Sequence, residues 1–471
     1  MKHTRFLFVY IVAAAVLAAI PACAPTTAES PIAPAAQLAQ PRGFQQALPP
    51  PILHVVPIFD YPGGNDGVDP VPVLSGNPTQ TLYGVTTDGG APGLGLGVVY
   101  SLTPPAVQGD LYTETVLHTF TGPDGAHPAA GLFPIDITGS GTLFGTTKFG
   151  GAFDRGTVYE ISTDGMTFKT IYSFQGGSDG AVPSSLLETD SAGNLYGTTL
   201  QGGLSGCGAT SCCPNRCGTV FELVHNPDNT YTEQIIYRFK WGTDGWYPFG
   251  TLGQLHGVFY GTTLFGGNSE CAGNPNVVPG GQGCGTIYRL QPGANGFTET
   301  VLHRFVEGAD GNRPLAHMIH IGGTFYGTTL GGGSPACVNG CGTVFKFATA
   351  GGTYSVIHRF QGGPQGGQPR GGLTIFNGTL YGTTISGGNS LPCGFTTGCG
   401  VMYGVTPQGM YSVLCIVERP NDGLNPQTTV FHGPQTTALF GSTLAGGLHG
   451  FGKVFQFDGI TSSPPSGKTF C

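Results

Sequence analysis

Side chains that could carry acid–base chemistry are scarce in this sequence. Only 9% of its 471 residues are charged, with 18 Lys and Arg against 26 Asp and Glu, and the formal net charge is −8. Ordinary soluble domains carry about 25% charged residues. A lyase or glycosidase needs paired carboxylates or a metal ion, whereas the predicted loops offer only the scattered acids Glu270, Glu307 and Asp154. The composition therefore favours binding over catalysis, and so few cations argue against a nucleic-acid partner.

Cysteines are the second reactive group. Ten of the 13 fall in four consecutive loops of a repeat described below: Cys207, Cys212, Cys213, Cys217, Cys271, Cys284, Cys337, Cys341, Cys393 and Cys399. In an exported chain, such clustering predicts disulfides within each loop. A metal site between Cys207 and Cys217 is the competing interpretation, but no second matching C-x₂-C pair is present. We therefore expect disulfides and no metal.

The disulfide pairing is only partly determined by the sequence. Each of the last three loops holds two cysteines, but the first holds four, so its pairing stays open. Cys415 and Cys471 remain, and a bond between them would attach the C-terminal tail to the sixth sheet.

Both tryptophans of the chain lie in one loop. Trp241, Trp246 and Tyr247 stand together, next to two of the cysteine-rich loops. Exposed aromatic rings beside small polar residues form stacking surfaces for sugar rings or peptide side chains, so we predict these three residues as ligand contacts. The alternative is that they fill the space between neighbouring sheets, as large aromatic residues often do.

Two other repeated residue types have structural explanations. His118, His303 and His358 recur at a position that also holds Tyr172 and Tyr237, which indicates packing rather than a set of ligands. Six turns contain Asp-Gly, but each has a single Asp, and a calcium loop needs several oxygens at close spacing. The Asp is expected to bond local backbone N–H groups. No cofactor is expected.

The N-terminus resembles an export signal. Lys2 and Arg5 precede a short apolar run that ends just before Cys23, so we interpret residues 1–22 as a signal peptide. Ile20, Ala22 and Cys23 resemble a bacterial lipobox, which predicts a lipidated Cys23 followed by a Pro- and Ala-rich tether over 23–51. Ordinary cleavage, with a free Cys23 and no tethering role, is the alternative.

The rest of the chain is built from seven copies of one unit of about 60 residues. A Leu-Tyr-Gly phrase marks each copy, with its Gly at Gly84, Gly145, Gly197, Gly261, Gly327, Gly382 and Gly441. A Gly pair, a Thr-Val-Phe phrase, an aromatic-ended run and an Asp-Gly-x-x-Pro turn follow in fixed order. The copies contain four short runs of β-branched and aromatic residues bounded by turn residues, which predicts four strands per copy.

This pattern predicts an all-β fold, a seven-bladed β-propeller with four antiparallel strands per blade. We name the strands A (after the proline), B (Leu-Tyr-Gly), C (Thr-Val-Phe) and D (aromatic-ended). The first recognisable strand, near 53–59, is of type D, and the last, near 453–457, is of type C. Pairing these two would close the ring, because both exposed edges are then satisfied. The propeller is thus predicted over 52–457, followed by a tail over 458–471.

The repeat resembles the GloVer (Gloeo/Verruco) tandem repeats of bacterial surface proteins, and its layout is similar to kelch repeats without their Trp. The resemblance covers about residues 53–457. It implies an exported, anchored protein and supplies no catalytic residue.

The loops suggest where a ligand would bind. All D–A turns and B–C loops are expected on one face, and the long B–C loops are consecutive, at 204–217, 268–284, 334–341 and 389–399. We therefore expect a lipid-anchored propeller of the bacterial cell envelope, at the outer membrane or cell surface. It would act as a non-catalytic module that binds a glycan, peptide or protein. An exported enzyme acting on polysaccharide and a purely architectural surface protein are the alternatives.

Overall fold

The computed structural model describes most of the repeat region. The described residues are 54–71, 75–76, 81–91, 93–107, 110–128, 130–134, 141–203, 217–267, 283–294, 296–388, 398–417, 424–427, 429–432, 438–458 and 469–470. Several predicted features lie outside them: the signal peptide, the tether with Cys23, Glu270, and Cys207, Cys212, Cys213, Cys271, Cys393 and Cys471. Within the described ranges, no helix is long and apolar enough to cross a membrane.

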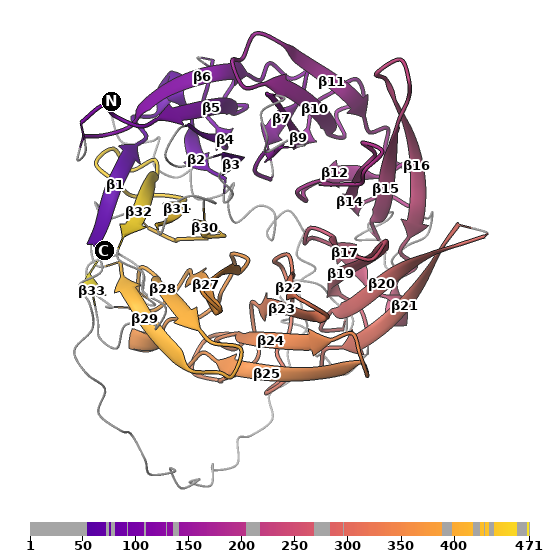
Figure 1. Ribbon diagram of the computed structural model, residues 1–471, viewed down its shortest axis with the longest axis vertical. Coiled ribbons are helices and arrows are strands. Elements are labelled where there is room, and N and C mark those ends of the chain that lie inside the picture. Colours follow the sequence, from indigo (N-terminus) through magenta and orange to yellow (C-terminus); the bar gives the residue numbers. More distant parts are fainter. Residues whose placement is uncertain are drawn as a thin grey trace, which may run out of the picture.

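Seven antiparallel sheets form a closed ring around a central channel, which confirms the predicted seven-bladed propeller (Figure 1). The A strands lie innermost and the D strands outermost. Blade 1 comprises β2 (Val68–Pro70), β3 (Ser75–Gly76), β4 (Leu82–Asp88), β5 (Val98–Thr103) and β6 (Thr113–Thr119). Blade 2 comprises β7 (Ala126–Pro128), β8 (Phe133–Pro134), β9 (Thr142–Phe149), β10 (Thr157–Ser162) and β11 (Phe168–Ser173). Blade 3 comprises β12 (Ala181–Pro183), β13 (Glu188–Thr189), β14 (Leu195–Gln201), β15 (Thr219–His225) and β16 (Tyr231–Arg238).

The remaining blades repeat this order. Blade 4 comprises β17 (Trp246–Pro248), β18 (Gly253–Leu255), β19 (Val258–Phe265), β20 (Thr286–Gly293) and β21 (Gly296–Arg304), and blade 5 comprises β22 (Ile319–Ile321), β23 (Thr324–Thr329), β24 (Thr343–Ala348) and β25 (Thr353–Arg359). Blade 6 comprises β26 (Thr374–Phe376), β27 (Thr379–Thr384), β28 (Val401–Val405) and β29 (Tyr411–Ile416). Blade 7 comprises β30 (Phe431–His432), β31 (Leu439–Thr443) and β32 (Lys453–Asp458), and β1 (His54–Asp60) completes it. The described helices are three short 3₁₀ turns, η1 (Gly64–Asp66), η2 (Gly242–Asp244) and η3 (Gly363–Gln365).

Both ends of the chain are held by the ring. β1 pairs antiparallel with β32, from His54 opposite Asp458 to Asp60 opposite Lys453, so the N-terminal strand supplies the outer strand of the last blade as predicted. Near the C-terminus, β33 (Thr469–Phe470) pairs in parallel with β29, with Thr469 opposite Cys415. The tail thus docks on the sixth sheet, where the sequence placed it.

Paired threonines link strands B and C. In blades 2 to 5, the second Thr of the B strand lies 2.8 Å, oxygen to oxygen, from the Thr that opens the C strand. In blade 3, for example, the Thr199 hydroxyl also accepts a bond from the Thr219 N–H and donates to the Gln201 carbonyl. Because these hydroxyls are buried and fully used, the Thr residues of the two phrases have a structural role.

The Asp-Gly turns also have the structural role predicted. In blade 3, the Asp179 carboxylate accepts bonds from the Gln175 N–H and the Tyr172 hydroxyl. In the turns that contain Asp124 and Asp310, His118 and His303 take the place of the tyrosine, at 2.9 and 3.1 Å. Histidine and tyrosine are interchangeable here because each can donate to this carboxylate.

Neighbouring blades are joined by a glycine and a proline. The glycine that opens each C strand has φ between +85° and +103°, and a Cβ on it would lie 2.5–2.8 Å from the proline Cδ of the next blade. The seven contacts are Gly97–Pro128, Gly156–Pro183, Gly218–Pro248, Gly285–Pro314, Gly342–Pro369, Gly400–Pro426 and Gly452–Pro70. The last of these joins blade 7 to blade 1 and so closes the ring at its inner edge.

A backbone hydrogen bond accompanies these contacts. At six of the seven seams, the N–H of the residue before the proline donates to the carbonyl of the residue before the glycine, with nitrogen–oxygen distances of 2.6–3.4 Å. The residue before the proline has a positive φ, between 53° and 63°, in all seven blades. Each seam therefore depends on a glycine that has no side chain and on a strained residue that makes the bond.

Gly452→Ala should destabilise the ring at its closing seam. The new Cβ must enter a space filled by Pro70 and by the Thr443 carbonyl, at a positive φ, so we expect the free energy of unfolding to fall by more than about 2 kcal/mol. Urea denaturation would measure the loss. Gly93→Ala is the matched control, because Gly93 has φ +86° but nothing within 4 Å. Equal losses for the two variants would show that backbone strain alone, and not the seam contact, sets the cost.

Candidate functional site

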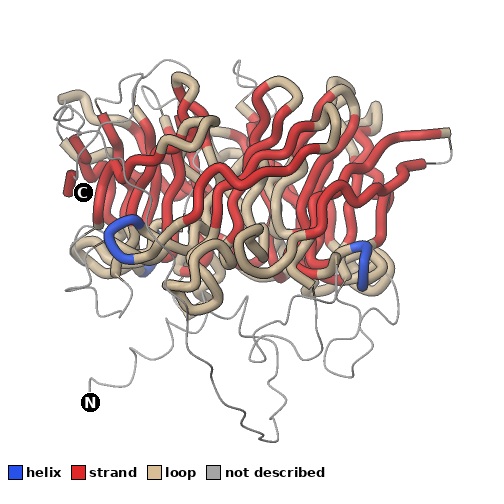
Figure 2. The backbone as a smooth tube through the Cα atoms, turned by 90° about the horizontal axis from the view of Figure 1, so that it is seen from below, coloured by secondary structure: helices blue, strands red, loops and turns tan. Residues whose placement is uncertain are grey.

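The D–A turns and the B–C loops lie on one face, where η1, η2 and η3 are found (Figure 2). Six blades show the link directly. The second glycine of the Gly pair donates its N–H to a carbonyl of the preceding D–A turn, at 2.7–2.9 Å, for example Gly203 to Gly177 and Gly388 to Gly363. The D–A turns and the described ends of the B–C loops are therefore on a common face of the ring.

One disulfide is described in full on this face. Cys337 and Cys341 are bonded in the B–C loop of blade 5. A Cβ on Gly362 would lie 3.0 Å from the Cys337 sulfur, so the disulfide packs against the D–A turn of the next blade. The buried cysteines at the ends of the other long loops, Cys217, Cys284 and Cys399, are disulfide-bonded, as is Cys415.

The structure separates the three aromatic residues predicted as contacts. Trp246 is only 2% exposed and stacks between Trp241 and Phe265, with ring centroids 4.6 Å apart on each side. Trp241 and Tyr247 are partly exposed and pack against the same cluster. Trp246 therefore has the packing role that the sequence left open, and Trp241 and Tyr247 are the rings that a ligand can reach.

Trp241 is held in an unusual backbone conformation. Its φ is +73°, and the equivalent position of three other turns is a glycine with a similar φ, namely Gly63, Gly176 and Gly362. A left-handed non-glycine residue costs about 1–2 kcal/mol. Stacking on Trp246 offsets part of this cost, and such outliers gather at functional sites.

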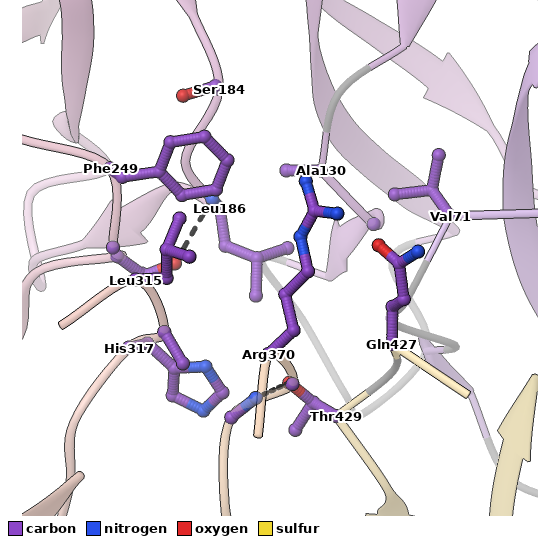
Figure 3. Close-up of a pocket in the computed structure, with 16 residues that line it drawn as sticks. Val71, Ala130, Ser184, Leu186, Phe249, Leu315, His317, Arg370, Gln427 and Thr429 are labelled. Atoms are coloured by element: carbon purple, nitrogen blue, oxygen red, sulfur yellow. Dashed lines mark hydrogen bonds between the residues drawn. The ribbon is translucent and has the colours of Figure 1, made fainter. Parts of the chain in front are cut away.

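A second candidate site is the central channel, which contains a cavity of about 90 Å³ (Figure 3). All seven blades contribute to its lining through the segment that follows the repeat proline. The residue after the proline faces it in six blades: Val71, Ser184, Phe249, Leu315, Arg370 and Gln427. Leu186, Thr251, His317 and Thr429 contribute two positions further along. The cavity is thus mostly apolar, with one cation and a few hydrogen-bonding groups.

The charged groups of the channel are strongly desolvated. Burial lowers the pKa of Arg370, and burial lowers the pKa of His317 to about 4, so the imidazole is neutral at neutral pH. Burial, followed by repulsion from Arg370, lowers the pKa of Lys148 to about 8. Within the described ranges, neither Arg370 nor Lys148 has a carboxylate oxygen within 4 Å.

Two carboxyl groups interact electrostatically with Lys148. Burial and the neighbouring carboxylate of Asp88 raise the pKa of Asp69 to about 7, and Lys148 opposes this shift. Asp88 is held by His127, whose Nδ1 lies 2.9 Å from Oδ1. The three residues come from strands β2, β4 and β7 of blades 1 and 2.

The scattered acids considered from the sequence have other roles. Asp154 accepts a bond from the Gly150 N–H within its own loop, and Glu307 is exposed. The paired carboxylates and the channel cations were missed by the sequence analysis. A signal was present for Arg370: it is a charge directly after the repeat proline, where the other six copies have uncharged residues.

The ring of seven four-stranded blades defines a β-propeller built from tandem repeats, with loops gathered on one face and a narrow channel. The chain belongs to the Gloeobacter/Verrucomicrobia repeat family, whose model matches residues 81–274, 211–391 and 276–470. No curated protein is significantly similar to it in sequence.

Several solved structures share the architecture at low sequence identity. An oligogalacturonate lyase from Vibrio parahaemolyticus has a TM-score of 0.44 and 12% identity, over 87% of this chain and 92% of the lyase. A GH74 enzyme from Niastella koreensis has a TM-score of 0.43 and 16% identity, over 87% of this chain and 55% of the enzyme. The β-propeller domain of the Trilobed protease from Pyrococcus furiosus has a TM-score of 0.43 and 10% identity, over 84% and 97%.

Asp69→Asn should change how stability depends on pH. The pKa of Asp69 is raised from 3.8 to about 7, so the folded state favours the neutral carboxylic acid. The stability that Asp69 contributes at low pH is therefore lost as pH rises from about 4 to 7. The amide cannot ionise, so the variant should gain more than about 1 kcal/mol relative to the unsubstituted protein between pH 5 and pH 8.

Urea denaturation at the two pH values measures this difference. The control is Asp164→Asn, because bonds from the Ser162 hydroxyl and the Met166 N–H lower the pKa of Asp164. Because that pKa lies below its usual value of 3.8, Asp164 is ionised in the folded and unfolded states at both pH values, and Asp164→Asn should show no change in relative stability between pH 5 and pH 8. A gain for Asp69→Asn that does not vary with pH would contradict the assignment.

Proposed function

We propose that the protein is an exported, lipid-anchored propeller that binds a glycan or peptide on its loop face without transforming it. The observation that carries this proposal is the partly exposed pair Trp241 and Tyr247, which buried Trp246 contacts at the turn between blades 3 and 4. Preorganised aromatic rings bind with little loss of conformational entropy.

Three further points support a binding role. The loops rest on a scaffold joined by seven seams, the Cys337–Cys341 disulfide packs against the turn of the next blade, and Trp241 keeps a costly backbone conformation where other blades have glycine. The membrane contact would be made by the lipid on Cys23 alone, across the tether of residues 23–51.

One observation favours an enzyme as a second candidate. Asp69 and Asp88 form a carboxyl pair in which one group has its pKa raised to about 7, a range suited to general acid–base catalysis. However, Asp69 is only 7% exposed and Asp88 is already bound by His127. The enzyme interpretation would replace the binding proposal if the protein released new reducing ends or unsaturated products from a polysaccharide and Asp88→Asn abolished this activity.

A glycan array probed with residues 52–471, which include every described residue, would identify the ligand class. For a ligand found in this way, Trp241→Gly should weaken binding by about 2 kcal/mol, roughly thirtyfold. The glycine relieves the left-handed strain, so the melting temperature should change little. Tyr247→Ala should also weaken binding.

Two variants serve as controls for this prediction. Phe153→Ala removes an exposed ring from the short loop of blade 2 and should leave binding unchanged. Trp246→Ala should lower the melting temperature, and it should weaken binding by the folded fraction less than Trp241→Gly does, because it removes a supporting ring and not a contact with the ligand. If Trp241→Gly binds as tightly as the unsubstituted protein, the contact assignment fails.

Cys23→Ser should release the protein from membranes. The thiol is the only attachment point for the lipid, and a serine hydroxyl cannot replace it in the lipidation reaction. Expressed in a bacterium that processes lipoproteins, the unsubstituted chain should sediment with membranes and the variant should be found in the soluble exported fraction. Partitioning that is the same for both chains would contradict lipid anchoring.

A further inference from the structure

Arg370 stands at a position that points into the centre of the ring. It follows Pro369, whose Cδ packs against Gly342 at a seam, so the backbone that carries Arg370 is fixed by the fold. Figure 3 shows its side chain extending into the cavity, with the guanidinium between Ala130 and Gln427. It is the only charged residue that lines the cavity in the described part of the chain.

The described residues supply no counter-charge to Arg370. Within them, its side chain makes no hydrogen bond and no ion pair, and it is partly exposed, toward the cavity. A partly buried arginine without a carboxylate lowers stability, and a bound anion would offset that loss.

A second cation lies near Arg370, although it does not line the cavity. Lys148 of β9 is close enough to Arg370 for their repulsion to depress its pKa, while Asp88 and Asp69 attract it. Its position holds Leu or Ile in five other blades, for example Leu200 and Leu264. An anion bound by Arg370 would also be attracted by the charge of Lys148.

The cavity selects among anions by shape. A planar guanidinium binds a carboxylate through two parallel N–H bonds. The walls next to it are apolar, from Phe249, Leu315 and Leu186. Polar atoms lie further along, where the Thr429 hydroxyl accepts the Gly372 N–H at 3.0 Å and can still donate its own proton. This combination suits an organic acid with a small body better than a compact, strongly hydrated inorganic ion.

We propose that the central channel binds a small organic carboxylate, with Arg370 as its bidentate partner and Lys148 as the second cation. About 90 Å³ of cavity admits the carboxylate and a few further atoms, so the ligand is a small acid or the acidic end of a larger molecule. The site is separate from Trp241 on the loop face, and it does not depend on whether that face binds a ligand.

Calorimetric titration of the full chain in detergent would test the proposal. The probes are acetate, lactate and glucuronate, with glucose as the neutral match for glucuronate and inorganic phosphate as the competing anion. At least one carboxylate should bind with a Kd below about 1 mM, whereas glucose and phosphate should bind at least about tenfold more weakly. Arg370→Gln should abolish this binding, and Lys148→Met should weaken it at least about threefold.

The same variants separate a binding role from a structural one. Without ligand, Arg370→Gln should melt at an equal or higher temperature, because a desolvated charge has been removed. Arg155→Gln is the matched control, since Arg155 is an exposed arginine on a loop of blade 2, and it should retain full binding. A lower melting temperature for Arg370→Gln would assign Arg370 to folding and overturn the proposal. So would carboxylate binding that survives Arg370→Gln, phosphate binding as tight as that of any carboxylate, or no carboxylate binding at about 10 mM.

Discussion

The contact between a glycine of one blade and the proline of the next is the constraint on which the rest of the structure depends. It leaves no room for a side chain at any of the seven glycines, including Gly452, which meets Pro70 across the closure of the ring. The residue before each proline has a left-handed conformation, and at six of the seven seams its N–H makes the accompanying hydrogen bond. The seams therefore restrict which residues the repeat phrases can hold.

The same constraint fixes where variable side chains lie. The residues before and after each proline have backbone positions set by the seam, but their side chains differ from blade to blade. Before the proline stand Asp69, His127, Val182, Tyr247, Arg313, Gln368 and Asn425, all with positive φ. After it stand the residues that line the channel. Seven equivalent backbone positions thus carry seven different side chains. The side chains that distinguish one blade from another are therefore concentrated next to the prolines.

Most of the architecture could be predicted from the sequence, because the strands and turns are local and repeated. The closure of the ring followed from the strand types at the two ends, and β1 pairs with β32 accordingly. The channel site could not be predicted in this way. Arg370, Lys148 and Asp69 come from blades 6, 2 and 1, and only the geometry of the ring brings them near one another. The role of Trp246 was left open because burial of an aromatic loop residue depends on its neighbours, here Trp241 and Phe265.

The two candidate sites share a wall, and this links the loop face to the channel. Tyr247 and Phe249 both pack against Val182 and Leu200. Tyr247 also contacts Trp246 of the aromatic cluster, and Phe249 lines the channel cavity. Only Pro248 separates the two rings, and Pro248 is held by Gly218, so the backbone that carries both rings belongs to the seam between blades 3 and 4. A ligand on Trp241 and an acid at Arg370 would therefore bind to parts of one structural unit. The geometry of this unit is set by the glycine–proline contacts rather than by the loops.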